Sequence, residues 1–347
     1  MESIKRFFYN LITDKNKSFY YRPLKFILWA LSLVYWLALW ARDAAYAVGI
    51  FRAKVLIGAK VISVGNITVG GTGKTPMTVK LATILRGKGK KVAVLTRGYG
   101  EDEYNMLKSY LGDMPVLKGK NRVRNGIKAI KNHKVDTLIL DDGMQHKRLH
   151  KDINIIMMDT KNPFGNGYLL PRGILRDRLS RMKEADLCVF TKTPEDLSIL
   201  SRLEERVRKN SVISNIFYTY HKPVSLYDIA GNREVPLDFL KNKEIAVLSG
   251  IADPEYFKRL LERLGAKISL EFSFMDHHSY KQREVDGILS VCDKRGLKII
   301  LTTDKDKVKL CKFFIDKPIK LFSLEIKIEF RKGENDFVNR LLGIYTR

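Results

Sequence analysis

The chain has 347 residues, which is enough for two domains with a full hydrophobic core. Apolar residues make up 45% of the sequence and charged residues 29%, a balance that excludes an intrinsically disordered protein. The formal net charge of +25 indicates a polyanionic partner, although a generally lysine-rich proteome would produce the same excess. The basic residues form neither a basic arm nor zinc-finger spacing, so we expect no nucleic-acid partner. Three widely spaced cysteines favour a reducing compartment over a disulfide framework.

The amino-terminal segment, residues 1–55, has the composition of a membrane-associated helix. Residues 26–41 hold no charge and would span about 24 Å as a helix, which is short against a hydrocarbon core of ~30 Å. All three tryptophans lie in this stretch, and tryptophan favours the membrane–water boundary. The first 25 residues carry six basic and two acidic residues, which suits anionic headgroups. We predict a monotopic helix; a single-pass anchor and a helix buried in a soluble core are the alternatives.

Residues 60–76 (KVISVGNITVGGTGKTP) have the layout of a phosphate-binding loop. A short apolar run ends in a glycine-rich turn that closes on Gly73-Lys74-Thr75, and an amphipathic helix pattern follows. Glycines let backbone N–H groups approach an anion, and the helix N-terminus adds positive potential. Lys74 would contact the outer phosphates, and the Thr75 hydroxyl would ligate Mg²⁺. We expect the nucleotide to contact Thr68, which stands where the usual spacing has glycine, and Val69, Gly70, Gly71, Thr72, Gly73, Lys74 and Thr75.

Apolar, β-branched runs alternate with helix-like stretches over most of the remaining chain. This alternation predicts an α/β fold with a mainly parallel sheet of the P-loop NTPase type. We expect a P-loop nucleotide-binding domain over residues 56–221 and a second, smaller α/β unit over residues 243–347 that completes the substrate site. Residues 222–242 contain two prolines and a glycine with little periodicity, so we place the junction there.

Two acids follow directly after the apolar run at residues 137–140. In P-loop proteins an acid at the end of such a strand holds the Mg²⁺ shell beside the loop, so Asp141 and Asp142 are candidate metal ligands. Gln145 continues along the carboxyl edge of the sheet, where ligands bind in open α/β folds. Acids that simply terminate a strand are the alternative.

Three further groups of residues are candidates for chemistry. Asp102 and Glu103 follow the predicted strand end at residues 96–99 and could accept a proton or bind metal, although taken alone they would be surface acids. Asp276-His277-His278 could form a proton relay or ligate a metal, but one such triplet is weak evidence. Thr191-Lys192 resembles the guanine-reading motif of GTPases. The acid that follows does not fall at the position that this motif requires, so we expect no guanine specificity.

Several motifs in this order resemble the lipid A 4′-kinase (tetraacyldisaccharide 4′-kinase) family: SVGNITVGGTGKTP (63–76), TRGYG (96–100), DEYNML (102–107), DDGMQH (141–146), PFGNGYLLPRGILRDRLS (163–180), DHHSY (276–280) and TTDKDKVKL (302–310). The resemblance implies transfer of the ATP γ-phosphate to the 4′-hydroxyl of a tetraacyl glucosamine disaccharide 1-phosphate. It also implies a glycolipid substrate, the anionic cytoplasmic face of the inner membrane as the site of work, and no obligatory protein partner.

The resemblance assigns roles residue by residue. Asp102 would be the base that accepts the hydroxyl proton, assisted by His277, and Lys74 would act on the transferring phosphoryl group. The metal would be held by Thr75, Asp141, Asp142 and Glu103, and Gln145 would lie near the γ-phosphate. Substrate binding is expected from Arg97, Tyr99, Asn166, Arg172 and Arg176. We expect Asp102 and His277 on different α/β units, so that they meet only when the units close over substrate.

Two other functions share the P-loop and the membrane segment. One is a membrane-associated regulatory ATPase without a lipid acceptor, and the other is a GTP-binding switch. Transfer of label from γ-labelled ATP or GTP to a lipid A disaccharide precursor separates all three.

Overall fold

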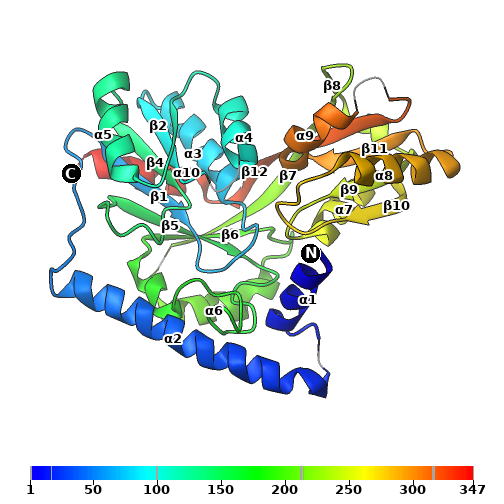
Figure 1. Cartoon of the computed structure of the whole chain (residues 1–347). Coiled ribbons are helices and arrows are strands. Elements are labelled where there is room, and N and C mark those ends of the chain that lie inside the picture. The colour runs from blue at the N-terminus through cyan, green and yellow to red at the C-terminus, as the bar shows by residue number, and fades with distance from the viewer. Residues whose placement is uncertain are drawn as a thin grey trace. The chain divides into compact units, whose positions relative to one another are not determined.

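The computed structural model describes residues 2–16, 18–98, 101–211, 213, 215–314 and 317–346, without the side chains of residues 2–6 and 101–102. The chain forms two compact units (Figure 1). Unit 1 comprises Met1–Gly98, Leu111–Tyr220 and Ile328–Arg347, and unit 2 comprises Tyr99–Tyr110 and His221–Lys327. Two long strands, β7 (Ile216–Asp228) and β12 (Lys320–Lys332), contribute residues to both units.

Unit 1 is built on a parallel sheet with the strand order β7-β6-β5-β1-β4-β2-β3. Its strands are β1 (Lys60–Gly65), β2 (Val92–Thr96), β3 (Val116–Lys118), β4 (Thr137–Asp141), β5 (Ile153–Asp159) and β6 (Leu187–Thr191). Their near-continuous apolar runs are buried, as expected of strands covered on both faces. Besides the amino-terminal helices, unit 1 contains the helices α3 (Lys74–Gly87), α5 (Arg122–His133), α6 (Ser201–Asn210) and α10 (Glu334–Leu342). The predicted fold class is confirmed.

The order of the strands in unit 1 brings the candidate site residues to one edge. β1 pairs in parallel with β4 on one side and with β5 on the other, so the loop after β1 and the acids that end β4 lie at the same carboxyl edge. In this register Val64 pairs with Asp141. The helix α3 buries Met77, Leu81 and Leu85 against the sheet, which confirms the amphipathic pattern expected after the loop.

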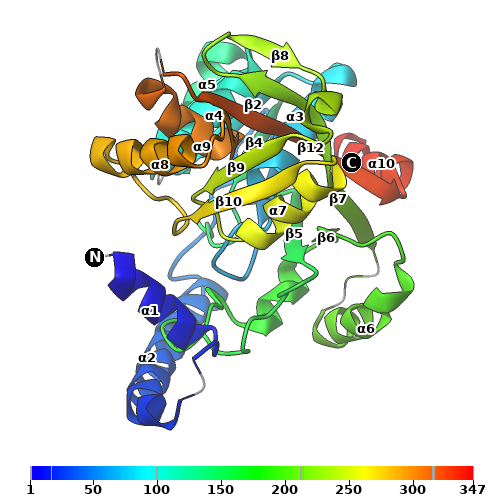
Figure 2. The same cartoon turned by 90° about the vertical axis from the view of Figure 1, so that its right-hand side faces the viewer.

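The amino-terminal helices are longer than the uncharged stretch of sequence indicates. After α1 (Glu2–Ile12) and a 3₁₀ turn η1 (Phe19–Tyr21), α2 runs from Arg22 to Ala47 over 26 residues, about 39 Å at ~1.5 Å per residue. Figures 1 and 2 show α2 as one unbroken helix with α1 folded back beside its first turns. In the described part of the chain, Phe19–Ala47 is the one helical stretch long and apolar enough to cross a membrane. Most of its apolar side chains are exposed.

Unit 2 contains a sheet with the order β10-β9-β11-β12-β7, to which β8 (Arg233–Val235) adds antiparallel to β7. Its other strands are β9 (Glu244–Ser249), β10 (Lys267–Ser273) and β11 (Ile299–Thr303), and its helices are α7 (Pro254–Arg263), α8 (Gln282–Lys294) and α9 (Asp304–Leu310). Residues 222–242, where we expected a junction, hold the rest of β7, β8 and the 3₁₀ turn η4 (Leu237–Leu240).

One helix of unit 2 comes from the middle of the P-loop domain sequence. All of α4 (Glu101–Leu111) except its last residue clusters with unit 2, although we had placed this segment in the domain of residues 56–221. The hydroxyl of Tyr110 donates a hydrogen bond to the carboxylate of Asp304 at the start of α9. Asp304 also accepts a hydrogen bond of 2.9 Å from Ser323. The contact between Tyr110 and Asp304 therefore joins α4 to a residue almost two hundred positions further along the chain.

Candidate functional site

The phosphate-binding loop occupies residues 65–73, between the end of β1 and the start of α3. Two of its glycines are required by geometry: a Cβ on Gly65 would lie 2.4 Å from the Cβ of Met144, and Gly73 has a left-handed φ of 77° where it caps α3. Lys74 is the first residue of α3, at the positive end of the helix dipole. Thr68 forms a β-bridge with Leu175, so its backbone is extended and needs no glycine.

Asn66 is the hub of the loop's hydrogen bonds, and our sequence analysis did not single it out. Its side chain is fully buried, and its amide donates to the hydroxyl of Thr72 over 2.9 Å. Its side-chain oxygen accepts from Lys74 Nζ over 3.3 Å, and its backbone carbonyl accepts from Gln145 Nε2 over 2.8 Å. Arg176 donates to both oxygens of Asn66. The asparagine that follows Gly65 in the loop motif was the available signal.

The two acids at the end of β4 have different surroundings. Asp141 is buried and accepts a hydrogen bond of 3.1 Å from the hydroxyl of Thr78 in the first turns of α3. Asp142 has a left-handed φ of 52°, and its carboxylate accepts two hydrogen bonds from Arg176, of 2.9 and 2.7 Å. Lys74 Nζ lies 3.7 Å from the same carboxylate.

The environment of Asp142 keeps its carboxylate ionised. Burial alone would raise the pKa of Asp142, but the hydrogen bonds from Arg176 and the charges of Lys74, Arg176 and Arg122 hold that pKa far below its usual range. The main chain of Asp142 is also held in place, because Arg122 donates a hydrogen bond of 2.9 Å to its carbonyl. An ionised carboxylate beside a phosphate-binding loop is a ligand suited to Mg²⁺.

The residues at this edge fit a Mg²⁺ ion that shares its shell with phosphate oxygens. The hydroxyl of Thr75 and the carboxylates of Asp141 and Asp142 are hard oxygen donors. Among the described residues, no three His, Cys, Asp or Glu side chains are grouped closely enough to hold an ion by themselves. Mg²⁺ commonly uses one or two carboxylates together with substrate phosphates, so this donor set fits.

The residues expected to bind substrate lie in different surroundings. Arg97 is exposed after β2, and Tyr99 lies outside the described residues. Asn166 donates to the carbonyl of Ile12 and to the carboxylate of Asp14, each over 2.9 Å. Arg172 binds both oxygens of Asp14 at 3.0 Å. Asn166 and Arg172 therefore fasten their segment to the chain between α1 and α2, whereas Arg176 reaches the phosphate-binding loop.

A group of basic residues surrounds the segment that follows Asp142. Burial, followed by the charges of Arg122 and Lys151, lowers the pKa of His146 to about 4. Burial and the charge of Arg181 lower the pKa of Lys151 to about 7, although Lys151 Nζ donates to the carbonyl of Met144 over 2.9 Å. His146 is therefore neutral at pH 7, and Lys151 is close to its midpoint.

Unit 2 carries a second charged cluster, made of Glu103 in α4, Asp276 and His277 before α8, and Lys305 in α9. Lys305 Nζ lies 2.8 Å from Asp276, 3.1 Å from His277 Nε2 and 4.0 Å from Glu103. His277 Nε2 also lies 3.7 Å from Glu103. His277 has a left-handed φ of 61°, which is uncommon for a residue other than glycine.

The expectation that Asp102 and His277 belong to different units is wrong. Residue 102 lies in the part of α4 that clusters with unit 2, as does His277, so closure of two units is not needed to bring their elements together. The side chain of Asp102 lies outside the described residues. Lys305 was missed in the sequence analysis, although the motif at residues 302–310 contains it.

Comparisons with known proteins show which family this chain matches. The profile of the LpxK family, described as tetraacyldisaccharide-1-P 4′-kinase, matches residues 24–345. A tetraacyldisaccharide 4′-kinase from Syntrophus aciditrophicus is 35% identical over 92% of this chain and 94% of its own. One from Halothermothrix orenii is 33% identical over 95% of both chains.

A solved structure has the same fold over nearly the whole chain. It is that of LpxK from Aquifex aeolicus, described as the "apo" form in complex with ATP. The TM-score is 0.71 at 28% sequence identity, and the match covers 93% of this chain and 99% of that one.

Proposed function

This chain belongs to the tetraacyldisaccharide-1-P 4′-kinase family, and from that premise we propose a role for each side chain around its phosphate-binding loop. The activity itself follows from the family: the chain is an ATP-dependent tetraacyldisaccharide 4′-kinase of lipid A biosynthesis, as the sequence motifs predicted. The family assignment excludes the two alternative functions, a regulatory ATPase without a lipid acceptor and a GTP-binding switch.

The observation that carries the proposal is that Lys74 and Arg176 each contact both Asn66 and Asp142. The backbone of residues 68–73 and the ammonium of Lys74 bind the β- and γ-phosphates. Gln145, which donates to the carbonyl of Asn66 in the loop, would lie near the γ-phosphate. Positive groups held in place before the reaction stabilise the charge that spreads over the transferring phosphoryl oxygens.

Thr75, Asp141 and Asp142 hold Mg²⁺ in this proposal, with Glu103 as an additional ligand. When bound, the ion neutralises charge on the phosphate oxygens. Arg176 keeps the Asp142 carboxylate ionised and oriented before the metal arrives. Asp142 is therefore available as a ligand without first losing a proton.

Asp102 accepts the proton of the 4′-hydroxyl, and His277 orients that carboxylate. Arg97, Tyr99, Asn166, Arg172 and Arg176 stay proposed as the residues that meet the glycolipid. For Asn166 and Arg172 the contacts with Asp14 favour an indirect role, because their side chains fix the segment on which Arg176 stands.

We place the enzyme at the anionic cytoplasmic face of the inner membrane, bound in a monotopic manner through α2. This placement is supported by the exposed apolar surface of that helix, on which Val34 is 63% exposed and Trp40 is 53% exposed. An apolar surface of this extent is unstable in water and suits the boundary between acyl chains and headgroups.

Two experiments test the proposal. Label transfer from γ-labelled ATP to a tetraacyldisaccharide 1-phosphate, with and without Mg²⁺, should require the metal, and Asp141→Asn and Asp142→Asn should raise the Mg²⁺ concentration needed. Transfer that is unchanged in chelator would reject the metal role.

The second experiment uses the fact that all three tryptophans lie in α2. Intrinsic tryptophan fluorescence of the unmodified protein therefore reports on α2 alone. In vesicles that contain brominated lipids, shallow bromines should quench it more than deep ones. Equal quenching at all depths would support a spanning helix, and no quenching would reject membrane contact.

A further inference from the structure

The helix α2 is attached to the rest of unit 1 along one narrow stripe. Leu28, Ser32 and Leu39 are its buried residues, and Tyr35 is half-buried between them. Residues spaced by three or four positions share one face of a helix. Between residues 26 and 41 all other side chains are exposed and apolar, so over this stretch α2 contacts unit 1 only along the stripe.

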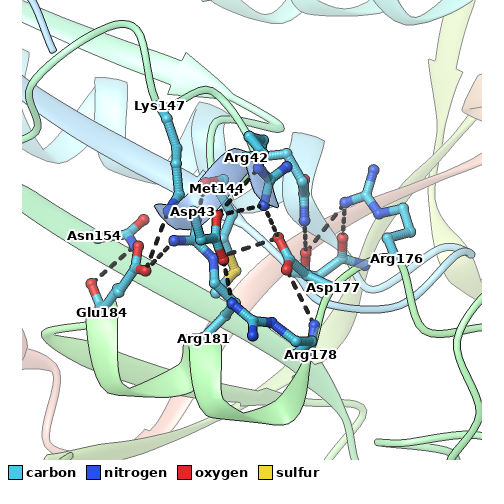
Figure 3. Close-up of polar contacts among 12 residues, drawn as sticks. Arg42, Asp43, Met144, Lys147, Asn154, Arg176, Asp177, Arg178, Arg181 and Glu184 are labelled. Atoms are coloured by element: carbon cyan, nitrogen blue, oxygen red, sulfur yellow. Dashed lines mark hydrogen bonds and ion pairs between the residues drawn. The ribbon is translucent and has the colours of Figure 1, made fainter. Parts of the chain in front are cut away.

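Tyr35 and the residues at the carboxyl end of the stripe contact three consecutive residues of the segment after β5, Arg176, Asp177 and Arg178. Figure 3 shows these three residues in a network of ion pairs. The hydroxyl of Tyr35 donates to the carbonyl of Arg176 over 2.8 Å. Arg42 lies 3.4 Å from the carboxylate of Asp177, which is fully buried. Arg178 binds Asp43, whose other oxygen lies 2.7 Å from Lys147.

The side chain of Arg176 points the other way, into the phosphate-binding site. Its guanidinium makes the two-point contact with Asp142 and also reaches Asn66. A bidentate contact between a guanidinium and a carboxylate requires a defined geometry at both ends. Arg176 thus contacts α2 through its main-chain carbonyl and a proposed metal ligand, Asp142, through its side chain.

We propose that Tyr35 is a positioning residue: by holding the main chain of Arg176 it fixes the guanidinium that orients Asp142, and so it raises the affinity of the site for Mg²⁺-nucleotide. The inference rests on the proposed function in one respect, the metal role of Asp142. It assigns a role in nucleotide binding to a residue of the membrane-associated helix, distant from the phosphate-binding loop in sequence.

The test measures nucleotide binding by calorimetry on full-length protein in phosphatidylethanolamine–phosphatidylglycerol vesicles. Tyr35→Phe removes one hydroxyl and leaves the ring in place. A single hydrogen bond contributes about 1 kcal/mol, so Mg²⁺-ADP should bind about 2–10-fold more weakly. ADP in the presence of chelator should bind as it does to wild type. Tyr20→Phe is the matched control, because Tyr20 is 88% exposed in the preceding turn.

A double-mutant cycle with Arg176→Ala separates positioning from general damage. If Tyr35 acts through Arg176, Tyr35→Phe should have no further effect on Mg²⁺-ADP affinity in the Arg176→Ala background. The inference is overturned if Tyr35→Phe binds like wild type, if it weakens ADP equally with and without Mg²⁺, or if its effect persists in full without Arg176.

The binding measurement contains no lipid acceptor, so a failure of phosphoryl transfer would not imitate a failure of this inference. Asp142→Asn provides the converse check. If that variant binds Mg²⁺-ADP like wild type, Asp142 is not a metal ligand and the positioning role of Tyr35 falls with it.

Discussion

The ammonium of Lys305 lies 3.1 Å from Nε2 of His277. An ammonium can only donate a hydrogen bond, so in this arrangement Nε2 accepts and the neutral imidazole carries its proton on Nδ1. This tautomer is assigned from the hydrogen-bond network. Lys305 also offsets the charges of Asp276 and Glu103. It therefore holds together the part of unit 2 in which we place the proton acceptor.

Replacing Lys305 by methionine should lower turnover by about 10²-fold, the low end of what acid–base assistance contributes. The KM for ATP should not change, because the phosphate-binding loop belongs to unit 1. Steady-state kinetics at saturating lipid measure both constants. Lys298→Met is the control, since that side chain is 63% exposed and pairs only with the exposed Asp293 among the described contacts. Normal turnover in Lys305→Met would show that the cluster is not part of the reaction.

Lys74→Ala should remove most activity while the fold survives. The ammonium is held by Asn66 and Asp142, in position to meet the charge of the transferring phosphoryl group. Loss of one such preorganised donor costs about 10²–10³ in rate. Lys88→Ala, on an exposed residue just after α3, is the comparison. A folded Lys74→Ala enzyme with near-normal turnover would mean that ATP binds elsewhere.

The parts of the site that follow from local sequence were predictable. The strand, glycine turn and Lys74 at a helix start are consecutive in the chain, and so are the apolar run of β4 and its two acids. The assignment of α4 to unit 2 was not, because it depends on the contact between Tyr110 and Asp304, which no local pattern encodes. The contact between Tyr35 and Arg176 is likewise set by how α2 packs.

Lys151 gives a prediction about pH and stability. Its pKa is lowered from 10.5 to about 7 in the folded protein, so between these values the unfolded chain binds more protons and the contribution of Lys151 to stability rises with pH. Below pH 7 the group is charged in both states and the cost of its burial is complete. Lys151→Met should therefore stabilise the protein at pH 7, on the order of 1–3 kcal/mol.

Denaturant unfolding of wild type and Lys151→Met at several pH values measures this difference. The gain should be largest at and below pH 7 and should fade as the pH approaches 10. Arg181 also donates to the Met144 carbonyl, so the variant does not leave that acceptor unpaired. A gain that is independent of pH would show that packing, and not the charge of Lys151, is responsible.

Asp102 and His277 should act as one catalytic unit. The substrate hydroxyl must lose its proton as the phosphoryl group arrives, and an imidazole can orient the carboxylate that accepts it. Because the elements that carry both residues belong to unit 2, the pair is expected to persist in the resting enzyme. Removing either residue should cost roughly 10²–10⁴ in turnover, and removing both should cost little more than the worse single change.

The experiment compares Asp102→Ala, His277→Ala and the double mutant at saturating ATP and lipid. His278→Ala serves as the control for position, because the ring of His278 stacks on Phe274 and its Nε2 lies 3.1 Å from Glu284, which gives it a structural role. Losses that multiply independently would contradict the pairing. If His278→Ala abolishes turnover in a folded protein while His277→Ala is mild, a pair would remain but His278 would be its histidine.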